Sequence, residues 1–107
     1  MSTFKRVQGN SLWLDVTCEL MDSIDSVWAN WAGSYTVSKT PGSTVLVTGV
    51  MTRSLTPGLF NVRLGPVSGG APWDDLPLGM YTLTTKVVNT TVDYEQEEHD
   101  KLNVYSL

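Results

Sequence analysis

The chain has 107 residues, 41% hydrophobic and 17% charged, which suits one domain with a single core, residues 1–107, and excludes a disordered tail. The formal net charge is −4 and the seven basic residues are scattered, which argues against nucleic acid or an anionic membrane as a partner. Cys18 is the only cysteine, so an intrachain disulfide is excluded, and no apolar run approaches the roughly 18 residues of a membrane span.

The clearest local pattern is the alternation of apolar and polar residues over Ser11–Leu20. A period of two predicts a β-strand with one face in a core. Cys18 falls on the apolar face, so we expect a small buried side chain there and not a nucleophile. Trp13 is the exception on the polar face. We expect it to lie either in an interface or beneath a covering loop.

A helical spacing follows the first strand. The apolar positions are Ile24, Val27, Trp28 and Trp31, which fall at i, i+3, i+4 and i+7. This stripe predicts a short helix or helical turn near residues 23–31, lying across the end of a sandwich, with Asp22 or Ser23 as its cap. We expect Trp28 and Trp31 to be ordinary core residues.

Strand patterns then come in quick succession, separated by turn residues every eight to twelve positions. The expected strands are Ser34–Lys39, Thr44–Thr52, Leu59–Leu64, Gly79–Asn89 and His99–Leu107. Thr44–Thr52 is apolar on both faces, which predicts a strand covered on both sides. Gly65–Pro77 is the longest stretch without periodicity. About seven short antiparallel strands of this kind predict an all-β sandwich or small barrel.

Residues for catalysis are scarce. His99 is the only histidine, and the sequence has neither a Gly-x-Ser-x-Gly elbow nor a glycine-rich phosphate loop. One histidine and one cysteine do not supply a usual zinc site. The acidic run Asp93–Asp100 could hold calcium, but we favour a solvated hairpin connection or a charged edge strand. We therefore predict no enzymatic activity, no metal and no cofactor.

Tryptophans and carboxylates supply the candidate interface residues. Trp73 precedes the carboxylate pair Asp74 and Asp75 in the aperiodic segment. One of these aspartates could cap a helical turn while Trp73 packs inward. Alternatively, Trp73 could be a stacking platform for a sugar, with the two aspartates as hydrogen-bond acceptors. Aromatic residues are enriched in interface cores, so Trp13 joins Trp73, Asp74 and Asp75 as a candidate interface residue.

The order of motifs also suggests a family. The motifs are Arg6-Val-Gln-Gly9-Asn-Ser before the first strand, Trp31-Ala-Gly33-Ser-Tyr-Thr-Val, Thr56-Pro-Gly58-Leu-Phe-Asn-Val, Leu76-Pro-Leu-Gly79-Met-Tyr81 and Glu95-Gln-Glu97. Over nearly its whole length the chain resembles the small immunoglobulin-like modules of tailed-phage virion proteins, such as the N-terminal domain of baseplate upper proteins. Asn10 stands where that family usually has an acidic residue.

The resemblance implies an immunoglobulin-like β-sandwich acting as a virion structural component of the tail, baseplate, neck or capsid decoration. We expect such a protein to form a homo-oligomer and to bind other virion proteins. It would be made in the host cytoplasm, because residues 1–9 lack the apolar run of a signal peptide. The alternative hypothesis is a carbohydrate- or receptor-binding module that takes a host glycan on the Trp73 loop.

Overall fold

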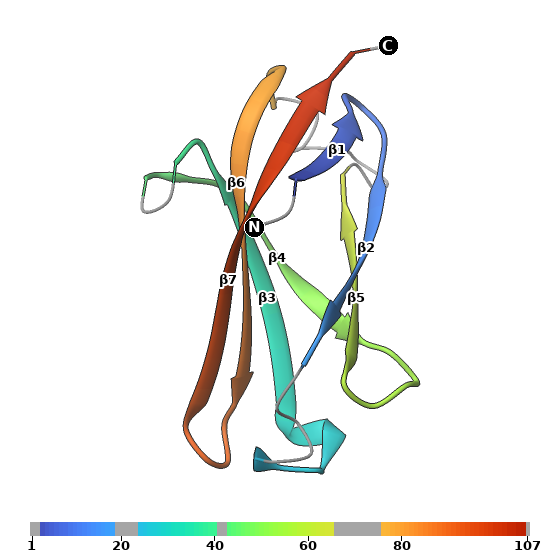
Figure 1. Ribbon diagram of the computed structural model, residues 1–107, viewed down its shortest axis with the longest axis vertical. Helices are drawn as coiled ribbons and strands as arrows, with labels where there is room; N and C mark the ends of the chain where they lie inside the picture. Colours follow the sequence, from blue (N-terminus) through green and yellow to red (C-terminus); the bar gives the residue numbers. More distant parts are fainter. Residues whose placement is uncertain (1–2, 19–23, 41–42, 66–75, 107) are drawn as a thin grey trace.

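The computed structural model describes residues 3–18, 24–40, 43–65 and 76–106, and Figure 1 shows an all-β protein. The strands within these ranges are β1 (Thr3–Val7), β2 (Leu12–Thr17), β3 (Trp31–Ser38), β4 (Val45–Arg53), β5 (Leu59–Leu64), β6 (Gly79–Asn89) and β7 (Tyr94–Tyr105). They form one sheet in the order β1-β7-β6-β3-β4-β5-β2. The predicted all-β class is confirmed, and the predicted bounds of β5 and β6 are correct.

The long strands β3, β6 and β7 form the centre of one layer. β6 pairs antiparallel with β3 on one side and with β7 on the other. β6 has eleven residues and β7 has twelve. β1 extends this layer by pairing with β7, where Phe4 lies opposite Leu102. This pair is parallel, so the expectation of an entirely antiparallel arrangement of short strands is wrong. The strand pattern of β1 was also missing from the sequence prediction.

β4 connects this layer to a second one. Its residues from Val45 to Met51 pair with β3, whereas only Thr52 and Arg53 pair with β5. β5 then pairs with β2 along its whole length. Figure 1 shows the consequence, because β5 and β2 stand apart from the β7–β6–β3 layer and are joined to it through the lower end of β4.

The two ends of the sheet are close in the chain. β1 and β2 are the outermost strands in the sheet order, and a tight turn at Gly9 joins them. Gly9 has φ of +84°, in the left-handed region that favours glycine, and the Asn10 amide donates to the Val7 carbonyl at 3.0 Å. The sheet therefore curls toward a barrel, although no described ladder joins β1 to β2.

The core lies between the two layers. Buried apolar side chains come from alternate positions of β5 and β6, as the sequence patterns predicted. The alternate apolar residues of β2 are partly buried against them, and Cys18, directly after β2, is buried. Trp31 is fully buried and makes an edge-to-face contact with Tyr94, while Trp28 packs on Phe60 at a ring separation of 4.8 Å. The prediction that Trp28 and Trp31 serve the core is confirmed.

Among the described residues of the expected helix near residues 23–31, Ile24 has helical backbone, Trp28–Asn30 form a 3-10 turn, and Trp31 already belongs to β3. Asp25 explains the difference. Its carboxylate accepts hydrogen bonds from the Val27 amide, from Asn30 and from Asn89 on β6, and its carbonyl accepts one from the Trp31 indole. These bonds stabilise a non-helical backbone, which is how aspartate competes with a helix. The proposed caps Asp22 and Ser23 lie outside the described residues.

The prediction that β4 is covered on both sides is wrong. Val47 and Met51 are buried on the inner face. On the outer face Val50 is 79% exposed and Leu46 is 42% exposed. In the described structure nothing covers these side chains, so β4 presents apolar residues to solvent.

Gly49 illustrates how tightly the inner face of β4 packs. The Tyr35 ring lies across it, and a Cβ at residue 49 would be 2.5 Å from the Tyr35 hydroxyl and 2.6 Å from ring carbons. We expect Gly49→Ala to lower the free energy of unfolding by about 1–3 kcal/mol, because the ring must shift in a packed interior. Urea unfolding measures this, with exposed Thr52→Ala as the control. Equal stability of Gly49→Ala and the natural chain would contradict the packing.

Asp25 gives the fold a pH dependence. Hydrogen bonds from Asn89, Asn30 and the Val27 amide, in that order of effect, lower the pKa of Asp25 below its ordinary value of 3.8. Because the pKa of Asp25 is lower in the folded protein than in the unfolded chain, its carboxylate contributes stability that is fully present above pH 3.8. This contribution is lost as the pH falls through the folded pKa. We therefore expect the Asp25→Asn variant to have a lower free energy of unfolding than the natural chain at neutral pH. The difference between the two should narrow below pH 3.8. Urea unfolding against pH, with exposed Asp15→Asn as the control, tests this. A difference independent of pH would contradict it.

Candidate binding surfaces

A slot lies where the curled sheet fails to close. β1 covers the edge of β7 only from Lys101 to Tyr105, so no described strand pairs with that edge of β7 from Tyr94 to Asp100. β2 has a free edge on the side away from β5, again within the described residues. At the lower end the Gln96 side chain donates to the Thr17 carbonyl at 3.3 Å, which links β7 to β2 across the slot.

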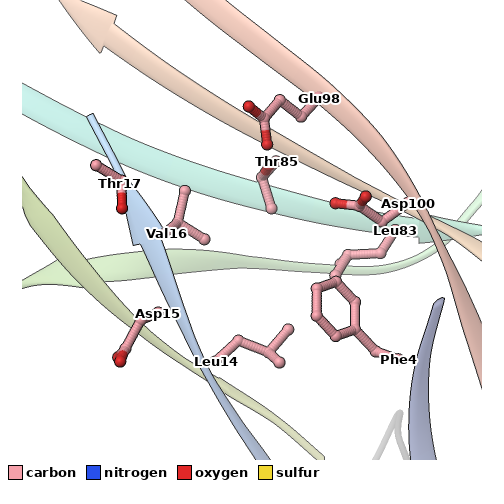
Figure 2. A pocket seen from close by; sticks show the side chains of 9 residues that line it. All are labelled: Phe4, Leu14, Asp15, Val16, Thr17, Leu83, Thr85, Glu98 and Asp100. Carbon is pink, nitrogen blue, oxygen red and sulfur yellow. The ribbon is translucent and has the colours of Figure 1, made fainter. Parts of the chain in front are cut away.

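The slot contains a pocket of about 240 Å³. It is lined by Phe4 of β1, residues 14–17 of β2, Leu83 and Thr85 of β6, and Glu98 and Asp100 of β7. Figure 2 shows Leu14 and Val16 on one wall and the two β7 carboxylates on the other, while Asp15 points away from them. The pocket thus joins an apolar wall to an acidic one, and both walls border strand edges.

The acidic run lies in β7 and distributes its side chains over both faces of the sheet. Glu95 and Glu97 face outward, where the Glu95 carboxylate lies 2.8 Å from the Lys86 ammonium and raises the pKa of Lys86. Glu98 and Asp100 face the slot. Carboxylates divided in this way do not converge on one ion. The charged edge strand, one of the two favoured interpretations of this run, is what the structure shows.

His99 and Cys18 lie on different sides of the sheet. His99 is on the outer face of β7, with Nδ1 2.9 Å from the Thr84 hydroxyl and Nε2 3.6 Å from Glu97. Cys18 is buried in the core on the other side of the sheet. Among the described residues there is no group of three or more histidine, cysteine or acidic side chains arranged to hold a metal ion.

Trp13 forms a second surface on the outer side of β2. It is 66% exposed, so it is not beneath a covering loop, and it remains a candidate interface residue. Arg63 on the paired position of β5 stacks over the indole, with its Cζ 5.5 Å from the ring centroid. Arg63 also donates to the Ser11 hydroxyl at 3.0 Å. The other candidates, Trp73, Asp74 and Asp75, lie outside the described residues.

No protein-family model, no curated protein and no solved structure matches this chain. In the described ranges, no helix has the length and apolar character needed to cross a bilayer.

The sequence prediction missed Phe4, Glu98 and Asp100 as parts of a site. Phe4 was missed because its strand places Arg6, a buried arginine, at the next inward position, which breaks the apolar alternation. Glu98 and Asp100 were missed because the start of β7 has acids where a closed core would need apolar residues. Polar residues at inward positions of a strand are the signal that could have indicated an open slot.

Proposed function

We propose that this chain is a non-enzymatic structural protein of a phage virion, a tail, baseplate, neck or capsid-decorating component. In this proposal it self-associates and docks on a larger virion protein. The observation that carries the proposal is the set of long strand edges without a partner strand in the described sheet, one of them beside the acid-lined slot. The resemblance of its motifs to immunoglobulin-like virion modules supplies the biological setting.

The architecture supports an immunoglobulin-like sandwich as the finer description of the fold. One layer contains β1, β7, β6, β3 and most of β4, and the second contains β5 and β2. Core side chains from both layers meet between them. In such sandwiches the loops cluster at the two ends and function depends on surface sites, so we expect loops and strand edges to contact neighbouring subunits.

Strand addition is the mode of docking that the slot favours. An extended partner segment would pair with the edge of β7 from Tyr94 to Asp100, which gives main-chain hydrogen bonds with little demand on sequence. Leu14 and Val16 would contact its apolar side chains. Glu98 would favour a basic residue in the segment, because charge complementarity guides protein association.

The same acids make this edge unsuitable for a second copy of the chain. Two copies pairing through β7 would bring Glu95, Glu97 and Glu98 near their own equivalents, and like charges placed opposite each other destabilise a sheet. The β7 edge therefore suits a different, more basic protein. The glycan hypothesis depends on Trp73, Asp74 and Asp75, and no described residue adds support to it.

We expect Glu98→Lys to weaken docking at least about tenfold, equivalent to about 1.4 kcal/mol, because it reverses charge inside the slot. Glu97→Lys is the matched control: it makes the same change one residue away on the outer face. Purified virion proteins encoded by the genes on either side of this one are the binding partners to test, by calorimetry. Binding to none of them, or equal weakening by both variants, would contradict the proposal.

A further inference from the structure

β4 has a second free edge with a different character. From Val45 to Met51 it pairs with β3 on one side, and within the described residues no strand pairs with its other side. Its outer face carries Leu46 and Val50, which are 42% and 79% exposed, and Val45 at the start of the strand is 50% exposed. The strand is thus unpartnered both along its edge and over part of its outer face.

This segment lacks the usual protection of an edge strand. The sequence from Val45 to Met51 is Val-Leu-Val-Thr-Gly-Val-Met, with no charged residue and no proline. Natural edge strands avoid pairing by means of charges, prolines and bulges. One bulge is present: Val37 pairs with Val47 and Ser38 pairs with Val45, so Leu46 has no partner on β3. The remaining edge, from Val47 to Met51, is regularly paired with β3, uncharged and rich in β-branched residues.

The distribution of charge favours a second copy of the chain as the partner of the β4 edge. Each copy carries −4 overall, and the acids on the β7 edge oppose contact between copies there. The cations on either side of Val45–Met51 in the chain contact other groups: Arg53, at the end of β4, donates to the carbonyls of Ala29 and Trp31, and Lys39 lies 4.4 Å from the centre of the Tyr81 ring. Two copies of this acidic protein can therefore approach most closely at β4.

We propose that two copies pair antiparallel through β4, about a two-fold axis beside Thr48. This rests on the self-association in the proposed function and assigns it to one surface. An antiparallel pair centred on Thr48 places Val50 of each copy opposite Leu46 of the other, on the outer face. Apolar cross-strand pairs of this kind stabilise a sheet. Arg53 then lies opposite Ser43, so no like charges meet.

The two-fold arrangement also sets the size of the assembly. Each copy uses its β4 edge once, and an isologous contact closes on itself. The product is a dimer with one continuous sheet that leaves both slots beside β7 open for a different protein. Larger species whose size grows with concentration would contradict this geometry.

The first test is sedimentation equilibrium of the full chain over a range of concentrations. Val50→Lys should raise the dimer dissociation constant at least tenfold, since the charge would be buried against Leu46 of the second copy. Leu55→Lys is the matched control, because Leu55 is likewise an exposed apolar residue but lies after the end of β4. A natural chain that stays monomeric, or a dimer that both variants weaken equally, would overturn the inference.

The second test fixes the register. Residues opposite each other in an antiparallel pair are close enough for a disulfide, so Thr48→Cys should cross-link two copies on mild oxidation, and Leu55→Cys should not. Equal cross-linking of both variants would overturn the inference. These results are independent of the slot. Loss of the β4 dimer with intact docking at Glu98 would overturn only this inference. A β4 dimer that binds no virion protein would overturn only the proposed docking.

Discussion

The change of partner within β4 is the constraint on which the rest of this structure depends. Because β4 leaves β3 after Met51 and joins β5 only through Thr52 and Arg53, the two layers separate and face each other around the core. The same separation leaves β4 unpaired along most of one edge. At the other end of the sheet, β1 is too short to cover β7, and the slot beside Glu98 remains open. The free edges follow directly from this topology.

These edges differ in charge, and from this difference we infer different partners for them. The first half of β7 carries acids on both faces, whereas Val45–Met51 of β4 carries none. An acidic edge repels a second copy and attracts a basic segment, while a neutral apolar edge accepts a second copy. In the proposed assembly, β4 therefore joins like subunits and the slot binds the larger protein. Neither contact requires a catalytic group or a cofactor.

Sequence patterns predicted the parts of this fold in which inward positions are apolar. Leu59–Leu64 and Gly79–Asn89 matched because Val62 and Leu83 lie in a closed core. The prediction failed where inward positions carry polar residues or where side-chain hydrogen bonds determine the backbone. Arg6, Glu98 and Asp100 are polar at inward positions, so β1 and the first half of β7 lacked the expected alternation. The stripe through Trp28 and Trp31 imitated a helix, but the hydrogen bonds of Asp25 fix another backbone. The apolar residues on both faces of β4 were recognised, but the outer face, which was expected to be covered, is exposed in the described structure.

The central claim is that a single copy exposes the backbone of β4 and that association covers it. Amide hydrogen exchange followed by NMR tests this directly, since amides in a paired strand exchange far more slowly than those facing solvent. In dilute solution, alternate amides from Val45 to Met51 should exchange much faster than those of β6, and they should become protected as the concentration rises. Protection of these β4 amides equal to that of β6 at the lowest concentration would contradict the account.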